Sequence, residues 1–135
     1  MAMDLALQGK KVLVTAGTKV IGEAVVTLLR DCGATVLASA RSRPASFPEE
    51  LFVAADLTTI QGCNMLVDAV NSRFGGVDII IHVLGGSAAP AGGFAALNED
   101  VWQHELNLNL FPAVRLDRAL LPQMLAQGEG VIIHV

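Results

Sequence analysis

One segment near the N-terminus has the residue types and spacing of a phosphate-binding turn. It runs Thr15-Ala-Gly-Thr-Lys-Val-Ile-Gly22, after a short apolar run and before a segment with helical apolar spacing. We therefore expect it to join a β-strand to the first turn of a helix. A glycine-rich turn at that place presents free N–H groups and the positive end of the helix dipole, which suit a phosphate or pyrophosphate.

Two common phosphate-binding patterns do not fit this turn. Gly17 and Gly22 match the glycines of a P-loop, but Glu23 stands where that pattern needs a lysine. Its carboxylate would repel a γ-phosphate, which argues against nucleotide hydrolysis. The dinucleotide fingerprint G-x-G-x-x-G also fails, because Lys19 stands where its second glycine belongs.

A third pattern fits better, and it is that of a known family. The turn resembles the T-G-x-x-x-G-I-G turn of the short-chain dehydrogenase/reductase family, through Thr15, Gly17, Thr18, Lys19, Ile21 and Gly22. The resemblance implies that the last five of these bind a dinucleotide cofactor. Ala16 and Val20 replace the first and middle glycines of the pattern. A β-branched residue tolerates positive φ and crowding poorly, so Val20 leaves three outcomes open: weaker cofactor binding, a shifted cofactor, or no binding.

Further matches follow in the family's order. Ala40-Arg41-Ser42 ends a second apolar run. An acidic residue in place of Ala40 would bind the ribose 2′-hydroxyl, whereas Arg41 would pair with a 2′-phosphate that Lys19 could also reach. The resemblance therefore implies that Arg41 and Ser42 bind the cofactor and favours NADP(H) over NAD(H). The alternative for Arg41 is a solvated loop cation.

Two later positions complete the cofactor site that the resemblance implies. Asp56-Leu57 matches the Asp–aliphatic pair that receives the adenine ring, with Asp56 accepting from the exocyclic amine. Asp56 could also be an N-cap or turn residue before the next helix, and the two roles are not exclusive. Gly85 and Gly86, in the segment where the family usually shows N-N-A-G, would let the backbone pass close to the nicotinamide ribose.

Asn109 is the catalytic residue that the resemblance assigns to this chain. It follows Trp102 by seven residues and precedes Leu110, as in the family, where this asparagine holds the catalytic lysine through a water. The alternative is that Asn109 satisfies backbone freed by Pro112. We expect His82 to be a core histidine, and His104 and Glu105 to be exposed helix residues.

The elements that must position these residues alternate along the chain. Apolar runs predict strands at 11–15, 35–39, 51–54, 77–84 and 130–135. Helical spacing predicts helices at 21–30, 59–74 and 99–125, with Leu28 and Met65 on apolar faces and a kink or division near Asn109 caused by Pro112. This pattern predicts an α/β fold: one Rossmann-type domain over 1–135, a doubly wound parallel sheet with helices on both faces, truncated after the fifth strand.

Composition narrows the function classes further. The 135 residues are 53% hydrophobic with a net charge of −4, which excludes intrinsic disorder and argues against nucleic-acid or anionic membrane partners. No targeting or membrane-spanning segment is recognisable. Cys32 and Cys63 are expected to be free thiols in a reducing compartment, so we expect a cytoplasmic protein.

Two other site chemistries fit poorly. Gly85-Gly-Ser87-Ala-Ala89 lacks the last glycine of a G-x-S-x-G nucleophile elbow, and the Pro and Gly residues after it cannot start the helix that an elbow needs. The chain has three histidines and two cysteines: His82, His104, His134, Cys32 and Cys63. Their spacing is not that of metal ligands, so no metal site is predicted.

The family's catalytic Ser and Tyr-x-x-x-Lys have no counterpart here, and the chain has no tyrosine at all. We therefore expect the cofactor-binding half of a longer NADP(H)-dependent oxidoreductase, which would act on a hydrophobic carbonyl or alcohol as a homo-oligomer. The 135 residues alone are expected to be inactive. The alternative is a catalytically inactive nucleotide-binding or interaction module.

Overall fold

The computed structural model describes residues 4–135. Its five strands form one parallel sheet in the order β3-β2-β1-β4-β5. The strands are β1 (Lys11–Thr15), β2 (Thr35–Ala40), β3 (Phe52–Ala54), β4 (Ile79–His82) and β5 (Val131–His134). The helices are α1 (Val20–Asp31), α2 (Ile60–Phe74), α3 (Glu99–Asn109) and α4 (Phe111–Gln127), with short 3-10 turns η1 (Glu49–Leu51) and η2 (Phe94–Ala96).

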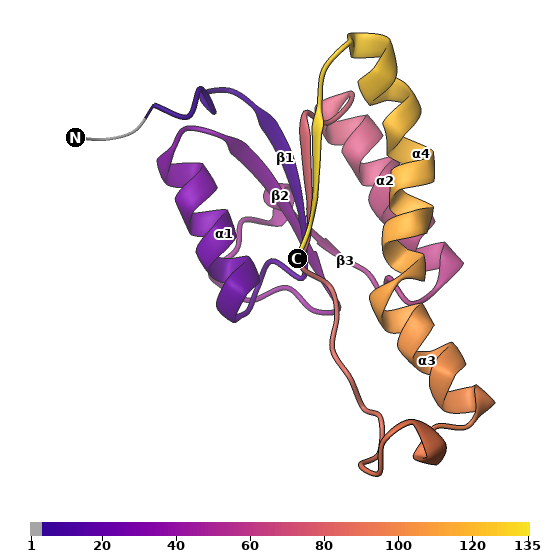
Figure 1. Ribbon diagram of the computed structural model, residues 1–135. Coiled ribbons are helices and arrows are strands. Elements are labelled where there is room, and N and C mark those ends of the chain that lie inside the picture. Colours follow the sequence, from indigo (N-terminus) through magenta and orange to yellow (C-terminus); the bar gives the residue numbers. More distant parts are fainter. Residues whose placement is uncertain (1–3) are drawn as a thin grey trace.

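Helices cover both faces of the sheet, so the predicted doubly wound α/β fold is confirmed. Figure 1 shows α1 on one side of the strands and α2 and α4 on the other. Successive side chains of β1 pack on opposite faces of the sheet, because strand residues alternate between the two faces. Val12 and Val14 pack in the cluster that includes Val26 of α1. Leu13 packs in the opposite cluster, with Leu66 of α2 and Leu120 of α4.

The predicted strand positions agree with the structure to within a few residues, but one residue on each of two predicted apolar helix faces is exposed. Leu28 is 59% exposed and Met65 is 54% exposed. Helix α1 instead buries Gly22, Val26 and Leu29. Each helix touches the sheet along a narrow line of residues spaced three or four apart, so an apolar neighbour beside that line remains in solvent.

The segment predicted as one long helix is divided. Helix α3 ends at Asn109, Leu110 is the joint, and Pro112 lies in the first turn of α4. Proline suits a first helical turn, where its missing N–H would have had no partner. Of the two predicted outcomes, a kink or a division, the structure has the division.

The ends of β1 and β4 are tied together at the carboxyl edge of the sheet. The Thr15 hydroxyl oxygen accepts the N–H groups of Val83 and Leu84, at 3.1 Å and 3.3 Å. Here the chain order reverses, since β1 lies between β2 and β4. Such a switch point is where open parallel sheets bind ligands. Within residues 4–135, the helices are all too short or too polar to cross a membrane.

Candidate functional site

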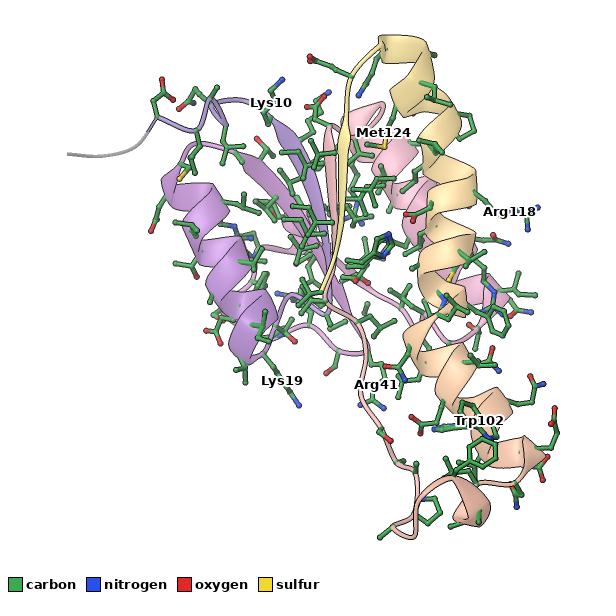
Figure 2. All side chains as sticks on the ribbon, in the orientation of Figure 1. Lys10, Lys19, Arg41, Trp102, Arg118 and Met124 are labelled. Carbon is green, nitrogen blue, oxygen red and sulfur yellow. The ribbon has the colours of Figure 1, made fainter. Side chains whose placement is uncertain are left out.

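The turns that leave β1, β2, β3 and β4 all lie at this carboxyl edge, because the strands are parallel. They carry every cofactor-binding residue that the sequence analysis assigned. Figure 2 shows the side chains of Lys19 and Arg41 at one end of the molecule and Lys10 at the opposite end. The strand order places the turns in the sequence β3, β2, β1, β4, so the candidate residues form a line along the edge.

Two glycines bring the first turn, α1 and the sheet into close contact. A Cβ atom on Gly22 would lie 2.0 Å from the Ala16 carbonyl oxygen. A Cβ atom on Gly17 would lie 2.9 Å from the Ala38 Cβ atom on β2. Both positions therefore need glycine for close packing. Thr18 beside them is half-buried, whereas Lys19 and Ile21 are exposed.

The N-terminus of α1 has no side-chain cap. Its N-cap residue is Lys19, which makes no capping hydrogen bond. By contrast, Thr59 caps α2 by accepting the Gly62 N–H, and Asn98 caps α3 by accepting the Val101 N–H. The first N–H groups of a helix have no intrahelical partner, so α1 offers free donors and a positive dipole end at the carboxyl edge.

Val20 stands in place of a glycine of the family pattern, and its backbone has the positive φ that a glycine would tolerate. Its φ is 42°, that of Ala16 is 55°, and the Val20 side chain is 83% exposed. A left-handed conformation costs an L-residue about 1–2 kcal/mol. The two replaced glycines are thus the two places where this turn is strained.

Asp56 follows β3 and is organised by its own turn. Its Oδ1 atom accepts the Thr58 N–H at 3.0 Å and the Thr58 hydroxyl at 2.7 Å. These hydrogen bonds lower the pKa of Asp56, and nearby Arg41 adds to the effect. Asp56 is therefore a turn residue, and Thr59 is the helix cap. Leu57 is 3% exposed, so its side chain belongs to the core.

Arg41 and Ser42 are both exposed at the end of β2. Arg41 is near enough to Asp56 to act on its pKa, so a cation and a carboxylate stand at neighbouring strand ends. Gly62 has a packing role that the sequence analysis missed. A Cβ atom there would lie 1.9 Å from the Asp56 carbonyl oxygen.

Asn109 clamps the turn after β4. Its Oδ1 atom accepts the Gly86 N–H at 3.0 Å, and its Nδ2 atom donates to the Gly86 carbonyl at 2.8 Å. Nδ2 also donates to the Glu105 carbonyl at 3.0 Å. A Cβ atom on Gly85 would lie 2.9 Å from Asn109 Oδ1. The side chain thus holds the glycine pair, and none of these contacts involves the backbone that Pro112 frees.

Glu105 does not lie free on the helix surface, contrary to the sequence prediction. It is half-buried, and its Oε1 atom accepts the Ala88 N–H at 3.1 Å. Glu105 and Asn109 are four residues apart and so share a helix face. That spacing could have identified Glu105 as a second anchor for the loop. His104 is exposed, as predicted.

His82 is buried at 5% exposure, as expected of a core histidine. Its Nε2 atom lies 2.7 Å from Asp117 Oδ1 on α4. Burial lowers the pKa of His82, while Asp117 acts in the opposite direction. His134 on β5 joins them: its Nε2 atom is 3.5 Å from Asp117 Oδ2. Sequence spacing could not predict this meeting, because the three residues come from different elements.

A small cavity of about 50 Å³ adjoins these groups. His82, His134, Asn109 and Pro112 are among the residues that line it. The imidazoles and the candidate catalytic asparagine therefore line the same small, partly open cavity behind the turn after β4.

Comparisons with known proteins agree with this geometry. The family model described as short chain dehydrogenase matches residues 10–135. The 3-oxoacyl-(acyl-carrier-protein) reductase FabG of Vibrio harveyi is 30% identical over 136 residues, which cover 96% of this chain and 55% of the relative. The chain spans about half the length of the curated relatives it matches.

Two similar solved structures contain nicotinamide cofactors. The L-sorbose reductase from Gluconobacter frateurii, complexed with NADPH and L-sorbose, is 31% identical with a TM-score of 0.86. The similarity covers 98% of this chain and 54% of that one. The NADH-dependent reductase A1-R′, complexed with NAD, is 27% identical with a TM-score of 0.84, and the similarity covers 98% and 61% of the two chains.

Proposed function

Because the chain belongs to the short-chain dehydrogenase family, we propose that it binds NADP(H) along the carboxyl edge of its sheet. In its complete form, the protein transfers hydride between this cofactor and a carbonyl/alcohol pair. This chain supplies the cofactor-binding half. The proposal is supported by similar structures complexed with NADPH or NAD, which share the nicotinamide group.

The uncapped N-terminus of α1 is the observation that carries the proposal. Its free N–H groups and dipole suit the pyrophosphate. Gly22 keeps this end of the helix against the Ala16 carbonyl, so the donors lie directly after β1. Thr18, Lys19 and Ile21 belong to the same turn and would line the pyrophosphate site.

The preference for NADP(H) rests on the end of β2. Ala40 contributes no carboxylate that would repel a 2′-phosphate, and exposed Arg41 and Ser42 follow it. A guanidinium pairs well with phosphate oxygens, often through two parallel hydrogen bonds. Exposed Lys19 at the neighbouring turn supplies a second cation.

The two ends of the cofactor would meet different groups. Asp56, held by Thr58, would accept from the adenine amine, and the backbone of Leu57 would lie beside the ring. Gly85 and Gly86 would lie against the nicotinamide ribose, with Asn109 fixing their position. When bound, the nicotinamide supplies or accepts the hydride. The chain's own residues orient it and hold the surrounding backbone.

The proton chemistry of the family needs groups that this chain lacks, since it contains no tyrosine. We propose that the 135 residues alone bind cofactor without dehydrogenase turnover. The same absence favours a second candidate, an inactive nucleotide-binding or interaction module. Carbonyl reduction by the complete protein separates the two functions, because only the enzyme consumes NADPH when a carbonyl compound is added.

The remaining assignments are also proposals. The segment 85–97 is mostly exposed and rich in small and apolar residues, so it would form one wall of a pocket for a hydrophobic carbonyl or alcohol. Pairing of copies through α3 and α4 would give a homo-oligomer. Cys32 and Cys63 are free, which supports a reducing location such as the cytoplasm.

Backbone NMR during an NADPH titration tests the proposed site. We expect shifts to concentrate at Gly17, Gly22, Arg41 and Gly86, with amides near Lys10 at the opposite end unchanged. Shifts centred near Lys10, or saturable binding without shifts at the carboxyl edge, would contradict the proposal.

A further inference from the structure

Three titratable side chains meet behind the turn after β4. His82 and His134 are in-register partners on the parallel strands β4 and β5. Their rings stack with centroids 4.9 Å apart and planes 15° apart. Asp117 of α4 faces both, with Oδ1 2.7 Å from His82 Nε2 and Oδ2 3.5 Å from His134 Nε2. The two oxygens of one carboxylate therefore face two imidazole rings.

This arrangement sets the protonation of the rings. An ionised carboxylate only accepts hydrogen bonds, so the His82 Nε2 atom that faces Asp117 carries the hydrogen. The Nδ1 atom of a neutral ring then has the lone pair and can accept a proton. The charge of Asp117 would stabilise the resulting imidazolium, as an aspartate does for a histidine base in other enzymes.

The same geometry argues against a metal ion, although the possible ligand atoms lie within 4.8 Å of one another. A zinc ion binds about 2.0–2.1 Å from an imidazole nitrogen, along the lone pair in the ring plane. Two stacked rings only 15° from parallel direct their lone pairs in nearly parallel planes, so these do not converge on one ion. The distance of 2.7 Å between His82 and Asp117 is that of a hydrogen bond.

The cavity connects this cluster with Asn109. Its volume of about 50 Å³ exceeds the 10–15 Å³ that one water requires. Both imidazoles and Asn109 line it, as does Leu108. Pro112 has no N–H, so the Leu108 carbonyl lacks the helical donor that would normally come from four residues later.

We propose that His82, Asp117 and His134 form a proton-holding unit that exchanges a proton with the Asn109 side of the site through water in this cavity. The inference rests on the proposed function, because carbonyl reduction consumes one proton from solvent. An imidazolium of the unit would give its Nδ1 proton to a cavity water and become neutral. That water would pass a proton past Asn109 to the alkoxide oxygen formed from the carbonyl, which completes the alcohol. His134, whose side chain is 58% exposed, takes the replacement proton from solvent.

Among residues 4–135, the groups whose charge acts on His82 belong to this unit. Asp117 from α4 and His134 from β5 are the titratable groups that act on its imidazole. On its other side, the in-register residue of β1 is Thr15, which carries no charge.

Nitrogen-detected NMR of histidine-labelled protein tests the unit without requiring activity. We expect His82 to carry its hydrogen on Nε2, the nitrogen 2.7 Å from Asp117 Oδ1, and to take up a second proton only below the ordinary range of histidine pKa values because of its burial. Asp117→Asn should abolish that tautomer preference. We also expect magnetisation transfer from bound water to the Asn109 side-chain amide and to both rings.

Glutamine variants of the complete protein test the relay. Gln keeps an N–H donor near the Nε2 position but cannot titrate, so His82→Gln and His134→Gln should lower kcat at least about tenfold and flatten its pH profile. NADPH affinity should stay within about twofold, and His104→Gln is the matched exposed control. If the wild type has no turnover, the proposed function fails, and NMR still decides whether the unit exists.

Three results would overturn the inference: hydrogen on Nδ1 rather than Nε2 of His82, no bound water beside Asn109, or glutamine variants with the wild-type pH profile. Stoichiometric Zn²⁺ binding that Asp117→Asn abolishes would also overturn it, since the cluster would then be a metal site.

Discussion

At the scale of the residue, Val20 is where this turn departs most from its family. Its φ of 42° lies where glycine is normally favoured, and its side chain is 83% exposed beside the uncapped end of α1. The side chain therefore stands next to the proposed pyrophosphate site without packing in the core. Val20 therefore strains the backbone of the turn and restricts access of the cofactor to it.

Val20→Gly should strengthen NADPH binding, because it removes a β-branched side chain from the turn and relieves the positive φ. The free energy of unfolding should change by less than about 1 kcal/mol, since relief of strain is offset by the greater entropy of glycine in the unfolded chain. A fluorescence titration and urea unfolding measure the two effects. Val25→Gly, in the interior of α1, is the control: it should lose stability. Unchanged or weaker NADPH binding by Val20→Gly would show that Val20 does not limit affinity.

Sequence reasoning reached some of these residues and not others. Gly17 and Gly22 could be identified because they lie within one local motif. Glu105 was placed on an exposed surface, although its spacing from Asn109 could have corrected this. Asp117 and His134 could not be assigned, because only the strand order β1-β4-β5 and the packing of α4 bring them to His82.

At the scale of the element, the close approach of α1 to β1 determines the site. Gly22 has no room for a Cβ atom, since the Ala16 carbonyl oxygen lies 2.0 Å from that position. Backbone would have to move to admit one. A change in this packing would therefore move the turn, the N-terminus of α1 and the edge of the sheet together.

Gly22→Ala should lower both the free energy of unfolding and NADPH affinity. The matched control is Gly75→Ala, at a helix C-cap with φ 68° and nothing within 4 Å of an added Cβ atom. The free energy of unfolding of Gly75→Ala should fall only by the cost of a left-handed alanine, about 1–2 kcal/mol. The free energy of unfolding of Gly22→Ala should fall by at least twice that amount. Urea unfolding measures both variants. Equal losses would mean that the turn relaxes around the new methyl group.

Most elements could be predicted from the sequence, for a physical reason. Each central strand is buried on both faces and so appears as a continuous apolar run, and Pro112 marks the division of α3 from α4. The helix faces were less predictable. Leu28 and Met65 are apolar but exposed, because periodicity alone does not say how wide a stripe the sheet will cover.

At the scale of the whole molecule, the two cores and the carboxyl edge depend on the same sheet. His82 is the last residue of β4, between β1 and β5. Burial lowers its pKa in the folded protein. The unfolded chain therefore takes up a proton at this residue at higher pH than the folded protein does.

The sign of the resulting pH dependence follows. Stability should be greatest above the unfolded histidine pKa of about 6.5, and should fall as the pH drops from there toward the lower folded pKa. His82→Gln should remove this part of the loss, whereas His104→Gln should keep it. Urea unfolding between about pH 8 and pH 5 measures it. If the wild type loses no more unfolding free energy over this pH range than His82→Gln does, the result would contradict the burial of a neutral His82.

The central claim is that the carboxyl edge binds NADP(H), with Arg41 recognising the 2′-phosphate. Calorimetric titration of the protein with NADPH and with NADH tests it most directly. Charge-assisted hydrogen bonds contribute about 1.5–3 kcal/mol, so NADPH should bind at least about tenfold more tightly than NADH.

Arg41→Ala should remove most of that preference and leave NADH affinity nearly unchanged. Arg118→Ala, an exposed cation on α4 away from the carboxyl edge (Figure 2), should keep it. Equal affinity for the two cofactors, tighter binding of NADH, or binding of neither would contradict the account.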